Sequence, residues 1–125
     1  MAGKLIADQI EHSTAGSLDT SYVVQGSAKA WAFIEGTGTP SITGSFNVAS
    51  LTDVQTGVVR ANFTNNMNNA NFSNLGTPRE DSSIVSIQEL KAILRATSSM
   101  VLKTHSTSTT VDTEARNYVL FGDLA

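Results

Sequence analysis

Cysteine is absent from the chain, so neither disulfide bonds nor thiolate metal ligands contribute to its stability. Charge is also scarce, because charged residues make up 15% of the sequence and the net charge is -3. A nucleic-acid-binding surface needs clustered lysine and arginine, which this composition does not supply. Residues 1–10 lack the apolar core of a signal peptide, and no apolar run has membrane-spanning length. We therefore expect no nucleic acid and no membrane as partner.

Motifs for catalysis and cofactor binding are missing as well. The two histidines, His12 and His105, have neither a neighbouring nucleophile nor a metal-ligand spacing. The run Gly36–Thr39 lacks the Lys-Ser/Thr ending and the following helix of a phosphate-binding loop. We expect a protein that is not an enzyme, with no catalytic residue, no metal site and no cofactor.

The acidic residues do not form an evident acid–base pair. Glu80 and Asp81 are adjacent, so in a strand they point to opposite faces. Asp112 and Glu114 can share a face, but no third catalytic group accompanies them. We predict that Asp112 and Glu114 are solvated loop acids.

What the sequence does contain is the two-residue period of β-strands. In the run from 28 to 34 both faces are largely apolar, which predicts a strand covered on both sides. The small-residue face suits close packing, either on a second sheet or on a neighbouring subunit. The residues of this face are Ala28, Ala30, Ala32 and Ile34, opposite Lys29, Trp31 and Phe33. Trp31 is either a core residue or a platform for sugar stacking, and its apolar surroundings favour the core.

The same period predicts further strands. Residues 45–48 alternate with Phe46 and Val48 on one side, and residues 53–57 form a turn. Residues 58–63 alternate again and end this part of the chain. Their inward side is predicted to hold Val59, Ala61 and Phe63.

The second half of the chain is less regular. Residues 64–82 are rich in asparagine, which predicts a long turn, with a carbohydrate-contacting loop as the alternative. Residues 82–87 predict a strand, whereas residues 88–96 fit either a strand or one short helix. Residues 99–105 predict a strand, residues 106–110 a turn, and residues 116–121 the strand that completes the sheet. One face of the 99–105 strand holds Met100, Leu102 and Thr104.

These patterns predict an all-β fold: an antiparallel β-sandwich, jelly-roll-like, of roughly eight short strands with an extended N-terminal arm. We assign residues 1–21 to a docking arm and residues 22–125 to the sandwich domain. The arm is too polar to bury much by itself, so we expect it to dock within an oligomer or onto another protein. The alternative is that it adds an edge strand to its own domain. Its apolar docking residues are Leu5, Ile6 and Ile10.

Several short motifs resemble a recurrent module of tailed-bacteriophage virion proteins, found at fibre tips and as small stand-alone proteins. The resemblance covers residues 22–125 and is loose between 74 and 98. The chain departs from the module at Ala32–Glu35, where an Asn-rich run is more usual, and at Gln55 in a turn. The motifs are Gly26–Trp31, Phe33, Gly36–Thr39, Ser45–Val48, Ser50–Asp53, Gly57, Asn62–Thr64, Met67–Phe72 and Asn117–Asp123.

The resemblance implies a homotrimeric knob on the surface of a phage virion, where it decorates or stabilises the capsid as a cement protein. The alternative is a tail-fibre or baseplate accessory protein that binds a host receptor or surface glycan. In both cases the partners are further copies of the chain and other virion proteins, such as the major capsid, tail or baseplate protein. We expect the oligomer or docking interface to contain Leu5, Ile6, Ile10, Ala28, Ala30, Ala32 and Ile34.

Overall fold

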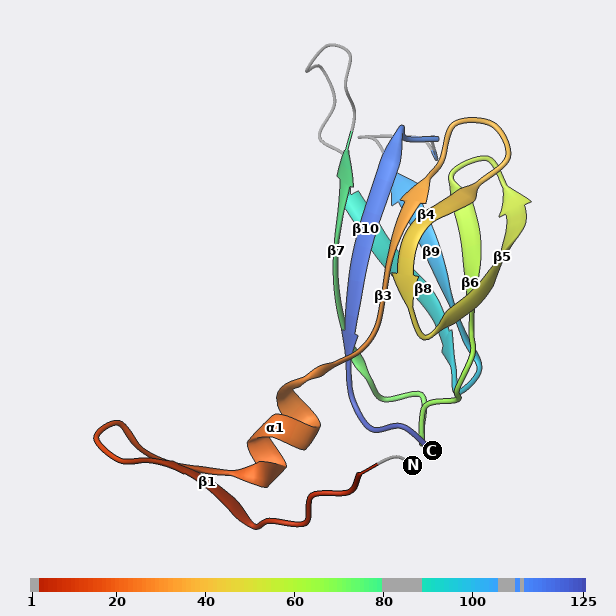
Figure 1. Cartoon of the computed structure of the whole chain (residues 1–125). Helices are drawn as coiled ribbons and strands as arrows, with labels where there is room; N and C mark the ends of the chain where they lie inside the picture. The colour runs from red at the N-terminus through yellow and green to blue at the C-terminus, as the bar shows by residue number, and fades with distance from the viewer. Residues whose placement is uncertain (1–2, 80–88, 106–109, 111) are drawn as a thin grey trace.

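The computed structural model describes residues 3–79, 89–105, 110 and 112–125. Two four-stranded antiparallel sheets among these residues pack face to face, which confirms the all-β sandwich (Figure 1). Before the sandwich come β1 (Gln9–His12), β2 (Gly16–Asp19) and α1 (Thr20–Gly26). The sandwich consists of β3 (Ala28–Glu35), β4 (Ser41–Phe46), β5 (Val48–Gln55), β6 (Val58–Phe63), β7 (Ser73–Arg79), β8 (Glu89–Ala96), β9 (Ser99–His105) and β10 (Ala115–Phe121).

The strand order defines two sheets. Sheet 1 has the order β4-β3-β10-β7, and sheet 2 has the order β5-β6-β9-β8. Each sheet contains hairpin-connected neighbours, namely β3 with β4 in sheet 1, and β5 with β6 and β8 with β9 in sheet 2. This order differs from a jelly roll, in which the chain winds from one sheet to the other between successive strands.

The core lies between the two sheets and follows the predicted alternation. Val59 and Ala61 of β6 are fully buried, and Phe63 is nearly so, which confirms the inward face predicted for residues 58–63. Met100, Leu102 and Thr104 of β9 are fully buried, as predicted. Since alternate side chains of a strand share a face, the period of the sequence was sufficient to identify these inward residues.

The chain passes from sheet 1 to sheet 2 at Asn47. This residue has a φ of 57°, a left-handed conformation that asparagine adopts more readily than most residues. Its amide donates to the carbonyl oxygens of Lys29 (3.0 Å) and Asn65 (3.1 Å) and accepts from the Asn65 N–H (2.7 Å). The corner interrupts the strand expected over residues 45–48. Phe46 therefore points outward and Val48 inward, so the prediction that they share one side was wrong.

The asparagine-rich stretch contains a strand that the sequence did not predict. Residues 64–72 form a connection, but β7 then pairs with β10 along its length, which corrects the expected turn through residue 82. Pro78 is tolerated there because β7 is an edge strand and needs no N–H on its free side. Of the two alternatives for residues 88–96, the strand is observed as β8. The expected strand at 82–87 and most of the turn at 106–110 lie outside the described residues.

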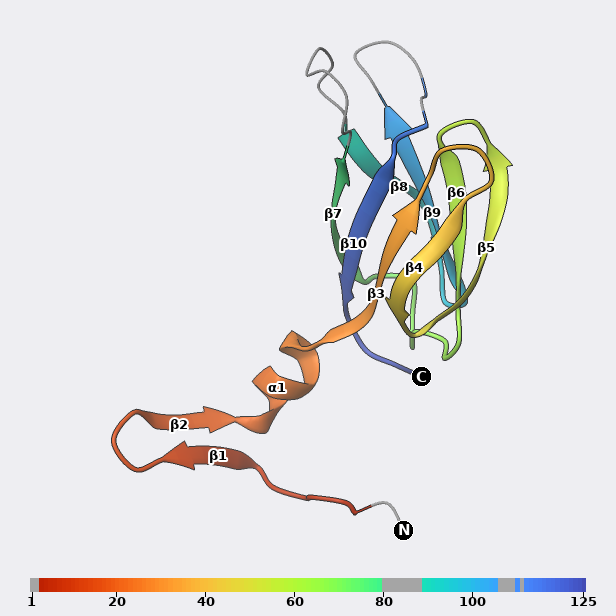
Figure 2. The same cartoon turned by 45° about the horizontal axis from the view of Figure 1, so that its top comes forward.

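The N-terminal part projects from one end of the sandwich, the end at which the C-terminus also lies (Figures 1 and 2). β1 and β2 pair with each other in a separate two-stranded sheet, so the arm does not add an edge strand to the sandwich. The boundary expected after residue 21 falls inside α1, and the sandwich begins at Ala28. From here on, "the arm" means residues 3–27.

Candidate docking site on the N-terminal arm

Local hydrogen bonds build the hairpin of the arm. The ring nitrogen Nδ1 of His12 accepts from the backbone N–H groups of Thr14 (3.3 Å) and Ala15 (3.1 Å) at the turn between β1 and β2. Gly16 follows with a φ of 94°, a value that suits glycine because it has no Cβ. His12 is thus a structural acceptor in the turn.

Helix α1 is held at both ends. Asp19 is its N-cap and accepts from the Ser21 N–H at 2.8 Å, and this hydrogen bond lowers the pKa of Asp19. The Thr20 hydroxyl donates to the Ala7 carbonyl oxygen (2.7 Å), which ties the extended segment to the helix start. At the other end the Lys29 ammonium donates to the carbonyl oxygens of Val24 and Ser27. A lysine of β3 therefore caps the helix and joins the arm to the sandwich.

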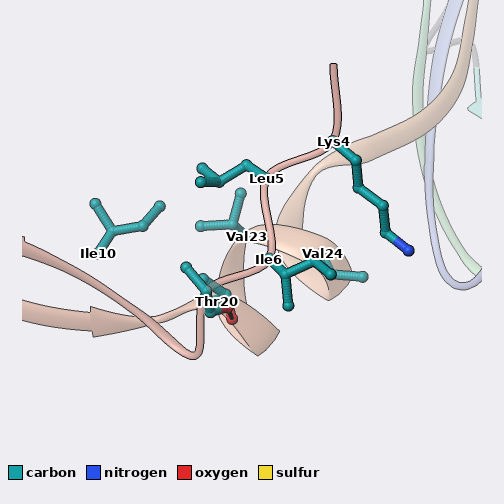
Figure 3. Close-up of a pocket in the computed structure, with 8 residues that line it drawn as sticks. Lys4, Leu5, Ile6, Ile10, Thr20, Val23 and Val24 are labelled. Carbon is teal, nitrogen blue, oxygen red and sulfur yellow. Dashed lines mark hydrogen bonds between the residues drawn. The ribbon is translucent and has the colours of Figure 1, made fainter. Parts of the chain in front are cut away.

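Between the extended segment, the hairpin and the helix lies an apolar hollow of about 470 Å³. Leu5 and Val23 face this hollow together, with Ile10 of β1 across from them (Figure 3). Leu5 is 86% and Ile6 80% exposed, and none of the seven residues of α1 is buried. The residues lining the hollow are Lys4, Leu5, Ile6, Ala7, Ile10, Thr20, Val23 and Val24.

The elements of the arm are too short to be stable on their own. A helix of this length lies well below the roughly 12–15 residues at which isolated helices become even marginal. A single two-stranded hairpin is also marginal in water without a further apolar surface to pack on. The apolar side of the arm therefore needs a covering surface, which the described part of the sandwich does not supply.

Unlike the apolar residues of the arm, the small-residue face of β3 is buried. Ala30 and Ile34 are fully buried and Ala32 is nearly so, all within the core between the two sheets. Ala28 is half-buried at the start of the strand. The face packs on the opposite sheet of the same chain, so Ala30, Ala32 and Ile34 offer no surface to a second subunit. This corrects their assignment to an oligomer interface.

The opposite face of β3 is only partly covered. Trp31 is 43% exposed, so the prediction of a core position was wrong. Phe33 is half-buried, and Lys29 is buried where it meets the end of α1. Alternation separates the two faces of a strand, but only the packing of the sheets decides which of two apolar faces is covered.

Among the described residues, Lys29 and Arg116 are the buried charged residues, and Arg116 is the more deeply buried of the two. The Arg116 guanidinium is 1% exposed, and burial lowers its pKa while the nearby carboxylates of Asp112 and Asp53 oppose this effect. Its Nη2 lies 3.4 Å from Asp112 Oδ1, and its Nε donates to the Thr113 hydroxyl at 3.2 Å. Asp112 is an exposed loop residue, as expected, but it also accepts from the Gly57 N–H (2.6 Å). The arrangement links β10 to the turn between β5 and β6.

Chemical groups for catalysis are not brought together in the described residues. There, no three His, Asp or Glu side chains are placed to hold a metal ion. His12 lies in the arm and His105 at the end of β9, where its backbone forms a bridge with Thr110. Glu80 and Asp81 lie outside the described residues. Within the described part of the chain, no helix has the length and hydropathy of a membrane span.

Comparison of the chain with protein-family models, with curated proteins and with solved structures finds no match.

Proposed function

We propose that the protein is a structural component of a tailed-phage virion: a surface knob whose β-sandwich is exposed and whose N-terminal arm docks onto the particle. The observation that carries the proposal is the uncovered apolar side of the arm, above all Leu5 and Ile6. The sandwich buries its own core, whereas the arm leaves its apolar side chains in solvent. An exposed apolar patch of this kind is typical of a protein–protein contact.

The motifs between Gly26 and Asp123 support the virion assignment, since they resemble a module of tailed-phage virion proteins. That resemblance also implies a homotrimer. With the small-residue face of β3 occupied by the core, we assign attachment, or contact with further copies, to the arm. We place the knob on the capsid as a decorating or cement protein; placement on a tail fibre or baseplate is the alternative. In neither place does the protein act as an enzyme.

The experiment uses phage particles that lack the protein. Purified protein is added to these particles, and the bound fraction is measured by co-sedimentation. The variant Leu5→Ser/Ile6→Ser is expected to lose binding, because it removes the two most exposed apolar side chains of the arm. Leu94→Ser is the matched control, since Leu94 is an exposed leucine on β8 of the sandwich. Unchanged binding of the arm variant would contradict the proposal.

Light scattering coupled to size exclusion measures the oligomer. A trimer has three times the 13.2 kDa mass of one chain. If the arm variant remains a trimer but no longer binds particles, the arm is the docking device. If it falls to a monomer, the arm is the device for oligomerisation. A monomeric parent chain would contradict the trimer, and cross-linking to capsid or to tail proteins distinguishes the two placements.

A further inference from the structure

An apolar stripe crosses the outer face of sheet 1. Phe46 of β4 lies opposite Trp31 of β3, Trp31 opposite Val119 of β10, and Val119 opposite Leu75 of β7. Phe46 is 51% and Leu75 65% exposed, beside the exposed Trp31. The four residues therefore form one continuous row from one edge of the sheet to the other. Three strand spacings of about 4.8 Å give this row a length of about 14 Å.

The ring of Trp31 packs over Gly44 of the neighbouring strand β4. A Cβ on Gly44 would lie 3.6 Å from Cζ3 and 3.9 Å from Cη2 of the Trp31 ring. The six-membered ring thus reaches over β4 at a position that has no side chain. Trp31 is nevertheless 43% exposed, so a flat ligand has access to its ring.

The next row on this face is uncharged and mixed, with Gly44 and Phe33 on one side of Asn117 and Thr77 on the other. Asn117 lies opposite Thr77, and both line a shallow hollow of about 230 Å³ next to Leu75 and Val119. The amide oxygen of Asn117 is buried and has no hydrogen-bond partner in the described part of the chain. Four further buried side-chain polar atoms of the described residues also lack a partner. Asn117 and Thr77 therefore matter here as the amide and hydroxyl side chains that line the hollow beside the apolar stripe.

We propose that this face of sheet 1 binds a neutral oligosaccharide, with Trp31 and Phe46 packing on sugar rings and Asn117 and Thr77 bonding hydroxyl groups. A pyranose ring has an apolar C–H side that packs on an aromatic ring, while its hydroxyls seek amide and hydroxyl partners. The length of the stripe fits a short oligosaccharide better than a single sugar. This inference goes beyond the proposed docking of the arm and does not depend on it.

The stripe does not have the charges of a nucleic-acid-binding surface. Neither the stripe nor the row beside it contains lysine or arginine, which bind the phosphate backbone of a nucleic acid. The ammonium of Lys29, on the same side of β3, is bonded to Ser27 and to Val24 at the end of α1. The uncharged stripe equally gives no attraction for an acidic polysaccharide, which the exposed Glu35 farther along the same side of β3 would repel.

The size of the stripe argues against a second copy of the chain as its occupant. Large apolar side chains present roughly 150–250 Å² each, so at the observed exposures the row offers roughly 350 Å². A stable protein interface buries roughly 800 Å² on each partner, of which somewhat more than half, roughly 450 Å², is apolar. A narrow row of this area matches the needs of a small ligand.

The fluorescence of Trp31 tests the proposal directly, because this residue is the only tryptophan of the chain. The full chain is titrated with maltoheptaose, cellohexaose and chitohexaose, and is applied to a printed array of bacterial surface polysaccharides. We expect at least one neutral glycan to bind, to shift the emission to shorter wavelength and to protect Trp31 from acrylamide quenching. No signal on the array and no spectral change with any probe would overturn the proposal.

Variants localise the binding. Trp31→Ala and Phe46→Ala are expected to weaken array binding at least about tenfold, as loss of a stacked aromatic side chain should. Leu75→Ala is compared with Leu94→Ala, an equally exposed leucine on sheet 2 that should leave binding unchanged. Because these side chains are exposed, the variants are expected to fold, which circular dichroism checks.

Two outcomes would refute the assignment even if a glycan binds. The first is unchanged affinity in Trp31→Ala and Phe46→Ala, which would place the sugar elsewhere. The second is a fall in oligomer mass in these variants, which would make the stripe a subunit contact. The arm variant Leu5→Ser/Ile6→Ser should keep glycan binding, so failure of the arm proposal and failure of this one are distinguishable.

Discussion

Replacing Asp112 with alanine is expected to destabilise the sandwich more than replacing Arg116 with methionine, although Arg116 is the more buried of the two. Asp112 has two partners in the folded chain, the Arg116 guanidinium at 3.4 Å and the Gly57 N–H at 2.6 Å. Its loss leaves a buried guanidinium whose remaining side-chain partner among the described residues is Thr113. A buried charge that loses its nearest counter-ion is costlier than the absence of both charges, and the Asp53 carboxylate offsets only part of this cost.

The magnitude follows from the exposure of the two partners. The Asp112 side chain is 38% exposed, so water screens the ion pair. The pair therefore contributes about as much to the free energy of unfolding as a surface pair does, about 1 kcal/mol. The hydrogen bond from Gly57 to a charged acceptor adds about 1.5 kcal/mol. Asp112→Ala should therefore lower the free energy of unfolding by about 2.5 kcal/mol. For a chain of this size the melting temperature falls by roughly 8–12 °C.

Arg116→Met removes the charge but keeps an apolar stem of similar length in the core. Asp112 then retains the Gly57 N–H and its contact with water, so neither group is left buried without a partner. We expect a cost of about 1 kcal/mol or less. Asp112→Asn keeps an acceptor for the Gly57 N–H but removes the charge. Its loss in the free energy of unfolding should lie between those of Asp112→Ala and Arg116→Met.

The assay is urea denaturation at pH 7, followed by far-ultraviolet circular dichroism. Asp123→Ala serves as the control, since the Asp123 side chain is exposed near the C-terminus and should contribute little. A larger loss in Arg116→Met than in Asp112→Ala would refute the reasoning. It would mean that the packing of the arginine stem, and not the balance of buried charge, stabilises this end of the sandwich.

Three further predictions concern backbone positions and pH. Gly36→Ala should lower the free energy of unfolding by about 1–3 kcal/mol in the same assay, because the new Cβ would lie 2.6 Å from the Thr113 carbonyl oxygen; an unchanged midpoint would contradict this contact. Asn47→Ala should be less stable than Asn47→Gly by about 1 kcal/mol, since both lose the amide hydrogen bonds but only alanine is strained at the observed φ of 57°; equal losses would argue against strain at the corner. The Asp19 carboxylate, whose pKa is lowered by the Ser21 N–H, stabilises α1 above its unfolded pKa, and this stabilisation is lost as the pH falls through the lower folded value. Amide exchange in α1, corrected for intrinsic rates, should accelerate in that acidic range for the parent chain and not for Asp19→Asn.

The strands whose faces differ clearly in polarity were predictable from sequence. In β6 and β9, every second residue is apolar apart from Thr104, and the residues of this parity face the core. The apolar exposure of Leu5 and Ile6 in the arm was also foreseeable, because their surroundings are too polar to form a core. Helix α1 was missed, although Asp19 before it and Gly26 at its end are the signals that mark helix termini.

The sequence by itself thus determined the all-β class, the inward residues of the regular strands and the exposure of the few apolar residues of the arm. These properties depend on neighbours along the chain, whose spacing the sequence states directly. Only the tertiary structure decided that Trp31 faces solvent, that β7 completes sheet 1 and that Asp112 meets Arg116. Each of these depends on which surfaces distant segments cover, and local periodicity carries no information about that choice.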